Sequence, residues 1–410
     1  MAIGSTVSHA PDVLVTRDGR SAPSLWNLDP HVVHINHGSF GAVPSNVLEY
    51  QDRLKASMEA APVGWFGSAP ERIGLAREMT ARFLGVDPDL TAFVPNASGG
   101  ASVIENCMEL HEGDEILVTD HGYGAVVMGA QRKARACGAH VIVVHIPLGA
   151  SDDEIVADIA EKLSERTALV IVDQITSPTA TVFPVAEIAA LAHGFGAKIL
   201  VDGAHVPCLL PIRPDIIGAD FWIGNLHKFA CAPRGCAVLV ASPDAAQDLY
   251  PLIDSWWYEK PFPQRFDMQG TLDQTSFLTA PYALNYIEET VGWDQARAYI
   301  ESMVCYGQDV IASAFEKITG DSHHVALPSP APAMRLVKLP SPLANNHDDA
   351  DLLRDHVFEK FHIEAAFTSF DSVGYLRLSA HIYNLAQDYQ QFAEVCVPEL
   401  CAWAEAGKTH

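Results

Sequence analysis

Lys198-Ile-Leu-Val-Asp-Gly-Ala-His205 and Asp220-Phe-Trp-Ile-Gly-Asn-Leu-His-Lys-Phe229 are two apolar stretches that lie close together in the chain. Short, continuous apolar runs of this kind are typical of buried strands in a parallel sheet. The strand in the first stretch is expected to end at Asp202, and Lys228 is expected to follow the strand in the second stretch. Because ligands bind at the carboxyl ends of strands in such sheets, an acid and a lysine should meet at one edge.

This pair of residues matches the needs of pyridoxal phosphate (PLP). A lysine forms a Schiff base with the cofactor, and an acid keeps the pyridine nitrogen protonated so that the ring accepts electrons. Taken singly, Lys228 is also compatible with a surface lysine and Asp202 with a helix N-cap. Together, in this strand context, they predict a PLP enzyme.

Strands and helices alternate from about residue 92 onward. The expected strands are 92–94, 115–119, 140–144, 168–172, 198–201 and 236–240, and the expected helices are 98–108, one through 132–135, 151–164 and 185–195. Ser151 and Glu154 have the spacing of a capping box. The alternation predicts an α/β fold with a mostly parallel sheet covered by helices on both faces.

Length and pattern predict a large domain and a smaller one. We expect an N-terminal arm over 1–30, a large cofactor-binding domain over 31–280 and a small C-terminal α/β domain over 281–410. In the last of these, helices are expected at 280–317, 349–361 and 386–404, with strands at 333–338 and 373–378.

Composition excludes several classes of protein. The formal net charge of −25 disfavours nucleic acid as a partner, because phosphate binding needs a basic face. No apolar run reaches the roughly 20 residues of a membrane helix, and no signal peptide is visible, so a cytoplasmic protein is expected. The eight cysteines are scattered and form no CxxC pair, which favours buried thiols over a disulfide framework or a metal site.

A phosphate site is expected in Asn96-Ala-Ser-Gly-Gly-Ala101, which follows a strand and opens a helix. Backbone N–H groups and the helix dipole favour an anion at such a place. Ser98 and the amides around Gly99 are the candidate phosphate ligands.

Six blocks of sequence resemble the class V aminotransferase family of fold-type-I PLP enzymes, and most closely its isopenicillin N epimerase-like branch. They are Ile35-Asn-His-Gly-Ser-Phe-Gly-Ala-Val-Pro44, Asp120-His-Gly-Tyr-Gly-Ala125, Asp202-Gly-Ala-His205, Asn225-Leu-His-Lys228, Phe266-Asp-Met-Gln-Gly-Thr-Leu-Asp273 and Arg377-Leu-Ser-Ala-His-Ile-Tyr-Asn384. They occur in the family's order and span nearly the whole chain.

The resemblance implies roles for individual residues. It makes Lys228 the Schiff-base lysine and proton shuttle, Asp202 the partner of the pyridine nitrogen, and Tyr123 the aromatic ring stacked on the cofactor. It also implies that Ser177 and His205 contact the cofactor ring or its phenolic oxygen, that Asn225 and His227 reach the phosphate, and that Thr271 reaches the phosphate of a partner subunit. The last role implies a homodimer with shared active sites. Arg377 is the candidate for the substrate carboxylate, in a small domain that would close over the substrate, and Asn36 and Trp65 are further candidate substrate contacts.

Two departures from the family pattern bear on the reaction. Desulfurases of the family carry a cysteine shortly before this arginine, whereas Glu364-Ala-Ala-Phe-Thr-Ser-Phe-Asp-Ser372 has none. Ala61-Pro-Val-Gly-Trp-Phe-Gly-Ser68 replaces a segment that often carries basic residues in epimerase-like relatives, where they would suit a substrate with a distal carboxylate. Trp65 and Phe66, with the later Ser255-Trp-Trp-Tyr258, form either an aromatic pocket or part of the core.

These features favour C–S β-lyase chemistry on a cysteine S-conjugate in specialised metabolism such as antibiotic biosynthesis, through a Lys228 aldimine and a quinonoid. Decarboxylation coupled to oxidative deamination, epimerisation and transamination stay open. A dinucleotide-dependent oxidoreductase is disfavoured because no G-x-G-x-x-G follows the first strand. A catalytically silent binding protein is disfavoured because Lys228 is present.

Overall fold

The computed structural model describes residues 9–410, which form two compact units. Unit 1 contains residues 9–41, 178–181 and 288–410, and unit 2 contains residues 42–177 and 182–287. Both units are therefore built from segments that are distant in the sequence. Residues 1–8 of the expected N-terminal arm lie outside the described residues.

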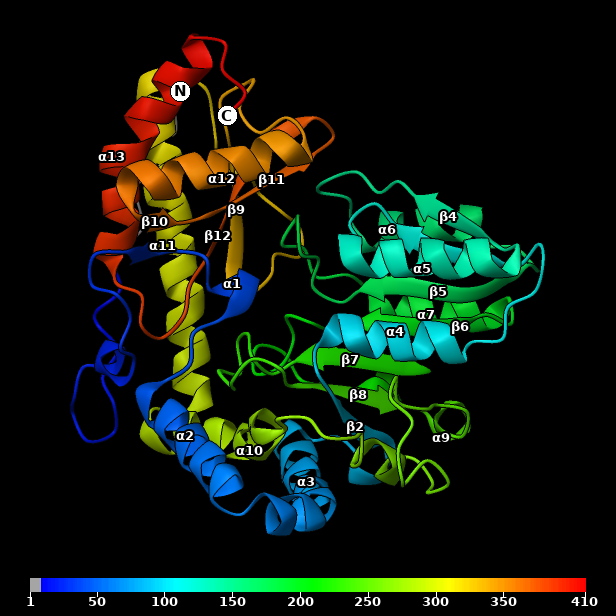
Figure 1. Cartoon of the computed structure of the whole chain (residues 1–410). Coiled ribbons are helices and arrows are strands. Elements are labelled where there is room, and N and C mark those ends of the chain that lie inside the picture. Colours follow the sequence, from blue (N-terminus) through cyan, green and yellow to red (C-terminus); the bar gives the residue numbers. More distant parts are fainter. Residues whose placement is uncertain (1–8) are drawn as a thin grey trace. The chain divides into compact units, whose positions relative to one another are not determined.

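Unit 2 is built on a sheet of seven strands within the described part of the chain (Figure 1). The order is β2-β8-β7-β6-β5-β3-β4. The bounds are β2 (Thr91–Val94), β3 (Glu115–Thr119), β4 (His140–Val144), β5 (Thr167–Asp173), β6 (Lys198–Asp202), β7 (Phe221–Asn225) and β8 (Ala237–Ala241). The pairs from β4 to β7 are parallel, whereas β8 is antiparallel to both β7 and β2.

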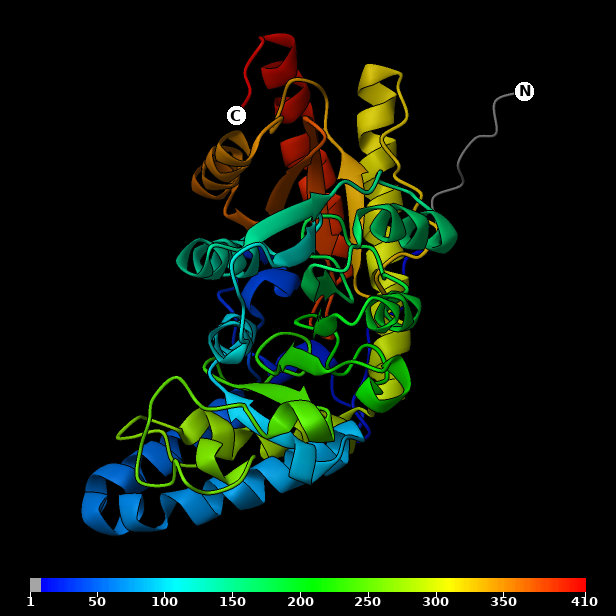
Figure 2. The ribbon, with the colours of Figure 1, turned by 90° about the vertical axis from the view of Figure 1, so that its right-hand side faces the viewer.

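Helices cover both faces of this sheet, as the alternating pattern predicts. Figures 1 and 2 show α4 (Ala97–Cys107) and α5 (Gly124–Cys137) on one face and α6 (Asp152–Lys162) and α7 (Val185–Gly194) on the other. Ser151 and Glu154 form the expected capping box at the start of α6. The mostly parallel α/β sheet is confirmed.

Other helices of this part of the chain did not emerge from the sequence pattern. They are α2 (Ser45–Ala60), α3 (Pro62–Leu84), α8 (Pro214–Ile217), α9 (Pro243–Ala246) and two short 3₁₀ helices, η2 (Pro88–Leu90) and η3 (Gln264–Phe266). The long α3 contains Gly64, Gly67 and Pro70, which hid it in the sequence.

Unit 1 combines long helices with a small antiparallel sheet. The helices are α1 (His37–Phe40), α11 (Trp293–Thr319), α12 (His347–Phe361), α13 (Ala386–Glu405) and the 3₁₀ helix η1 (Ala22–Leu25). The sheet has the order β11-β12-β9, with β9 (Met334–Lys338), β11 (Ala366–Phe370) and β12 (Val373–Ser379). A separate parallel pair joins β1 (Val33–His34) to β10 (Ile363–Glu364).

The single helix expected over 280–317 is wrong. The chain instead forms α10 (Thr275–Thr290) and α11, which begins at Trp293. Gly292 between them has φ +93°, a left-handed backbone that interrupts an α-helix and favours glycine. Within residues 9–410, no helix is long and apolar enough to cross a membrane.

Candidate active site

Lys228 lies in a buried position just after β7 in unit 2. Its Nζ is 3.0 Å from Nε2 of His205, which follows β6. The same Nζ lies 5.9 Å from the ring centroid of Tyr123, the N-cap residue of α5. Because β3, β6 and β7 run in one direction, their carboxyl ends bring these three residues to one edge of the sheet.

Asp202 is the last residue of β6 and is almost fully buried. Its Oδ1 accepts a hydrogen bond of 2.9 Å from the backbone N–H of Ala204. Its Oδ2 is buried and has no hydrogen-bond partner among the described residues. Burial raises the pKa of Asp202, while the Ala204 hydrogen bond and the charge of Lys228 lower it. A cationic N–H donor would satisfy Oδ2, so this residue fits the protonated pyridine of PLP.

The N-terminus of α4 lies after β2, where the phosphate site is expected. Asn96 caps the helix, and its Oδ1 accepts the N–H of Gly99 at 2.8 Å. Asn225, at the end of β7, accepts the N–H of Ala97 at 2.9 Å. These two amides are thus held by side chains of the protein, while Ser98 lies between them, half-buried.

His227 adjoins Lys228, and its pKa is lowered to about 4 by burial and by the charge of Lys228. The imidazole is therefore neutral at neutral pH, and its buried Nδ1 has no hydrogen-bond partner among the described residues. Thr271 is exposed in the segment that leads to α10. It follows Gly270, whose φ is +77°.

Asp173 is a buried residue of this edge that sequence reasoning missed. It ends β5 and pairs in register with Asp202 of β6. Burial and the neighbouring Asp202 raise the pKa of its carboxyl group well above the usual range, and the backbone amides of Tyr123 and Ser177 oppose this shift. The signal was present in the sequence, since the apolar run 168–172 ends in an acid just as the run before Asp202 does.

Arg377 lies in unit 1, buried on β12. Its Nη2 donates to Oδ1 of Asn36 at 3.3 Å and to Oγ of Ser39 at 3.0 Å. Ser39 also donates to Oδ1 of Asn36 at 2.8 Å. Residues 35–39 lie alongside the end of β12, since Ser379 accepts the N–H of Gly38 and donates its own N–H to the carbonyl of Ile35.

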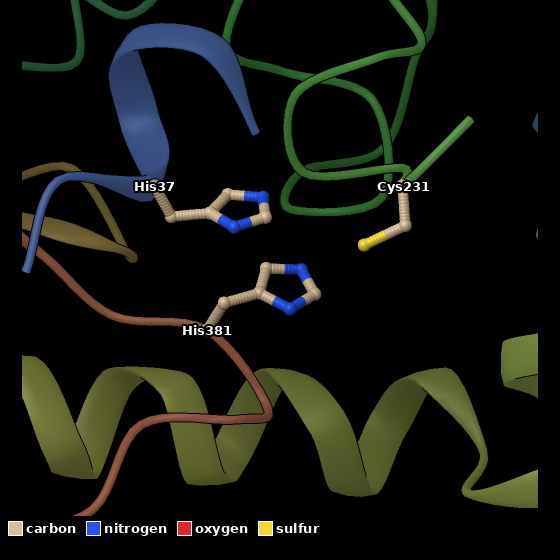
Figure 3. A group of neighbouring side chains, drawn as sticks. All are labelled: His37, Cys231 and His381. Atoms are coloured by element: carbon tan, nitrogen blue, oxygen red, sulfur yellow. The ribbon is translucent and has the colours of Figure 1, made fainter. Parts of the chain in front are cut away.

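A cluster of aromatic and histidine rings flanks this arginine segment in unit 1. His37 of α1 stacks on His381, which follows β12, with ring centroids 4.0 Å apart (Figure 3). Nδ1 of His37 lies 3.1 Å from the hydroxyl of Tyr383, and Trp26 contacts His381 and Tyr383 edge-on. Figure 3 also labels Cys231, a residue of unit 2.

The aromatic candidates of unit 2 have different environments. Trp65 is buried in α3, and the guanidinium of Arg72 lies 3.9 Å from its ring centroid. Trp256 is 89% exposed, and Tyr258 is also exposed. Among these residues, Trp65 is the one with the packed environment of a core or pocket side chain.

Comparison with known proteins identifies the family. Residues 49–392 match the sequence profile of the family described as Aminotransferase class-V. The chain belongs to this family. Its members depend on PLP, so the protein is a PLP-dependent enzyme, and the resemblance read from the sequence blocks is confirmed.

Two relatives span almost the whole chain. Isopenicillin N epimerase of Streptomyces clavuligerus is 28% identical over 401 residues, which are 93% of this chain and 98% of the relative. A putative L-cysteine desulfhydrase of Oryza sativa subsp. japonica is 27% identical, over 88% of this chain and 82% of the relative.

Among solved structures, the cystine C–S lyase C-DES is similar in fold. Its complex with the reaction product cysteine persulfide superposes with a TM-score of 0.74 at 20% identity, covering 90% of this chain and 97% of that one. Another structure of C-DES, with glycine covalently linked to the PLP cofactor, gives the same TM-score. The predicted fold-type-I architecture is thereby confirmed.

Proposed function

We propose that the protein is a PLP-dependent C–S β-lyase that acts on an S-substituted L-cysteine. The reaction would convert the substrate and water into a thiol, pyruvate and ammonia. The observation that carries the proposal is the hairpin before Arg377. Its β11 and β12 are joined directly through Asp371 and Ser372, both with positive φ.

This hairpin bears on the fate of sulfur. In the family's desulfurases a cysteine on the loop before the arginine accepts the sulfur atom. Here the two-residue turn of Asp371 and Ser372 leaves no loop at this point, and 364–372 contains no cysteine. A thiolate that leaves the substrate would then depart as a free thiol, which is lyase chemistry.

The residues of unit 2 fit the cofactor. Bound PLP would supply an electron sink conjugated with the substrate's Cα. In the proposal, Asp202 holds a proton on the pyridine nitrogen, Tyr123 stacks on the ring, and Ser177 and His205 contact the ring edge. Ser98, Asn225 and His227 surround the phosphate, which would replace the Asn96 side chain as the acceptor of the Gly99 N–H.

Lys228 is the proposed base that removes the proton from Cα. Its buried Nζ lies within hydrogen-bond distance of His205 Nε2. A neutral amine is needed for this task. Arg377 is proposed to bind the substrate carboxylate, supported by Asn36, and Trp65 to contact the sulfur substituent.

The test is product analysis of the purified, PLP-loaded protein with S-substituted L-cysteines in deuterated buffer. The proposal expects equal amounts of thiol, pyruvate and ammonia. Lys228→Ala is the control: it should form no borohydride-stable link to the cofactor and release no thiol.

Other outcomes would replace the proposal. Recovered substrate with deuterium at Cα and mixed configuration would establish an epimerase, the activity named for the Streptomyces relative. An aldehyde that retains the thioether would establish decarboxylation with oxidative deamination. A keto acid that retains the thioether would establish transamination.

The proposal also covers the oligomeric state, the localisation and the metabolic role of the protein. We propose a homodimer in which Thr271 reaches the cofactor phosphate of the partner subunit. Large apolar side chains exposed on α3 (Val63, Leu75 and Met79) and in the segment between α9 and α10 (Leu252, Trp256 and Leu272) support it. We also propose a cytoplasmic enzyme of specialised metabolism, such as antibiotic biosynthesis, on the similarity to isopenicillin N epimerase.

A further inference from the structure

Trp222 is the largest fully buried side chain in the described part of the protein, and the proposed reaction leaves it without a role. It lies in β7, one residue before Ile223, which pairs in register with Asp202 of β6. Successive side chains of a strand alternate between its two faces, so Trp222 and Asp202 point to opposite faces of the sheet. Any effect of Trp222 on this acid must therefore pass through the backbone.

The indole ring packs directly against the backbone of Gly203, the residue after Asp202. A Cβ atom on Gly203 would overlap Cζ2 of Trp222, and a Cβ atom on Gly224 would overlap its Cη2. The N–H of Gly203 also donates to the carbonyl of Ile223 at 2.8 Å. Because packing of this kind leaves no free volume, the turn after Asp202 has little freedom to move while the ring is present.

A hydrogen bond holds the indole ring in this place. Its Nε1 donates to Oε1 of Gln174 at 2.9 Å, and both residues are buried. The backbone N–H of Gln174 in turn donates to the carbonyl of Asp202 at 2.8 Å. A buried indole N–H without an acceptor is costly, so the side chain of Gln174 determines where the ring lies.

These contacts bear on the orientation of the Asp202 carboxyl group. Its Oδ1 accepts the N–H of Ala204, which follows Gly203 in the turn. Its Oδ2 is buried and has no hydrogen-bond partner among residues 9–410. A turn that shifted at Gly203 would move the Ala204 N–H and release Oδ1, so the carboxyl group could rotate. A fixed turn keeps Oδ2 as the oxygen that is left for another donor.

We propose that Trp222, anchored by Gln174, is a positioning residue that holds the turn after Asp202, so that Oδ2 of this acid faces the pyridine nitrogen of PLP. This inference rests on the proposed function, which places the cofactor at Asp202. In this role Trp222 does not touch the cofactor. It acts through the turn on the acid whose hydrogen bond keeps the ring nitrogen protonated.

The test compares Trp222→Phe, Gln174→Met and a control, Phe221→Leu. The first variant has a smaller ring without a donor, and the second removes the acceptor of the indole. Phe221 is buried at the start of the same strand, but its side chain points to the opposite face from Trp222. Its replacement therefore removes a buried ring without changing the contact with Gly203. Circular dichroism checks that each variant is folded.

The first readout is amide hydrogen exchange of the cofactor-free protein, compared with the other amides of β6 and β7. Trp222→Phe should accelerate exchange at Gly203 and Ala204 by about tenfold or more, because the packing that restrains this turn is lost. Gln174→Met should have a smaller effect in the same direction. Phe221→Leu should not single out these two amides.

The second readout is the protonation of the pyridine nitrogen, measured by ¹⁵N NMR of protein that is loaded with ¹⁵N-labelled PLP. In Trp222→Phe this nitrogen should lose its proton at a pH about one unit lower than in the wild type, since its anionic partner is less well oriented. We expect kcat to fall about tenfold with little change in KM. A loss of stability alone would not move the titration of the nitrogen, so Phe221→Leu should match the wild type.

Wild-type titration of the pyridine nitrogen in Trp222→Phe would overturn the inference, and so would an equal shift in Phe221→Leu. Unchanged exchange at Gly203 and Ala204 would also overturn it. If Trp222→Phe does not fold, Gln174→Met decides by the same two readouts. Failure of the proposed function is separate, because the wild-type protein itself would then form no lysine adduct with PLP.

Discussion

Arg377 illustrates how one side chain is oriented by its neighbours. Its Nη2 is directed by Asn36 and Ser39, both on the segment that runs beside β12. Because a guanidinium binds a carboxylate through a planar fork, its orientation matters as much as its charge. Asn36 and Ser39 are neutral acceptors that orient the guanidinium, and orientation is what a residue that binds a carboxylate needs.

The proposed carboxylate role predicts a specific kinetic pattern. Arg377→Ala should lower kcat/KM for every α-amino acid substrate by about tenfold or more, chiefly through KM, because a charge-assisted hydrogen bond is lost. The affinity for PLP should not change. Ser39→Ala should give a smaller effect in the same direction. Steady-state kinetics beside a PLP titration would measure both, and wild-type KM in Arg377→Ala would remove this residue from the substrate site.

Glu105 predicts a pH effect on stability. This acid of α4 is 1% exposed, and neither of its carboxyl oxygens has a hydrogen-bond partner among residues 9–410. It faces Gly129 of α5, where a Cβ would overlap its Oε2. Burial raises its pKa to about 7, although Arg132 and Lys133 oppose the shift.

The sign of the effect follows from proton binding. A raised pKa means that the folded protein holds the proton more tightly than the unfolded chain, so stability falls as pH rises from about 4.5 to about 7. The loss is at most about 3 kcal/mol. Glu105→Gln should flatten this decline and be the more stable protein at pH 8. Thermal unfolding of the wild-type protein and of Glu105→Gln from pH 5 to pH 8 tests this. The same dependence of stability on pH in both proteins would contradict the prediction.

For single residues, the sequence was sufficient where the type of the side chain itself indicates the chemistry. Asp202 ends one apolar strand and Lys228 follows the next, and this combination indicated the cofactor. Asp173 also ends an apolar strand but escaped notice. Its neighbour Asp202 ends the adjacent strand, and only the folded chain brings the two acids side by side.

A buried ion pair fixes α3 to the segment after η3. Arg77 and Asp267 are both nearly fully buried and are joined by two hydrogen bonds of 3.0 Å. Arg77 also donates to the carbonyl of Pro88 at 2.7 Å. Burial raises the pKa of Asp267, and the hydrogen bonds and charge of Arg77 oppose this shift. The pair therefore depends on both partners.

Removing one partner should be strongly destabilising. Arg77→Met leaves a buried acid without its cation, which costs about 3–5 kcal/mol of unfolding free energy. Arg82→Met, at an exposed position in the last turn of the same helix, is the control. Arg77→Met/Asp267→Leu should be more stable than Arg77→Met alone. Urea unfolding would measure all three, and a loss no greater than that of the control would refute the prediction.

Helices and strands were predicted well from the sequence where their hydrophobic pattern is regular. Apolar strands between helices were located to within one or two residues, since their hydrophobic runs are bounded by turn residues. Helix α3 was missed because glycine and proline occupy its first half, although burial of Ile73, Ala76 and Thr80 stabilises its second half. The break at Gly292 was missed because the helical periodicity resumes directly after it.

The proposed dimer predicts complementation between two inactive proteins. Lys228→Ala lacks the essential lysine, and Thr271→Val should impair binding of the partner's phosphate. A hybrid dimer contains one site with Lys228 from one subunit and Thr271 from the other, both intact. Mixing the two variants under conditions that exchange subunits should restore activity to at most about a quarter of that of the wild type.

Analytical ultracentrifugation would measure the mass of the protein in solution and hence its oligomeric state. The wild-type protein should sediment with twice the chain mass of 44.4 kDa. A dimer whose mixed variants show no gain would mean that the sites are not shared. A stable monomer with full activity would exclude the dimer altogether.

The parallel pairing of β1 with β10 links the two ends of the chain, since Val33 lies opposite Ile363. A ribosome makes proteins from the N-terminus, so β1 is synthesised on the order of half a minute before β10. During translation the sheet that carries Asp202 and Lys228 already has all its strands, whereas Asn36 and Ser39 still lack Arg377. An interrupted translation product thus has the cofactor's lysine without the arginine, and only the finished polypeptide carries the complete set of residues proposed for catalysis.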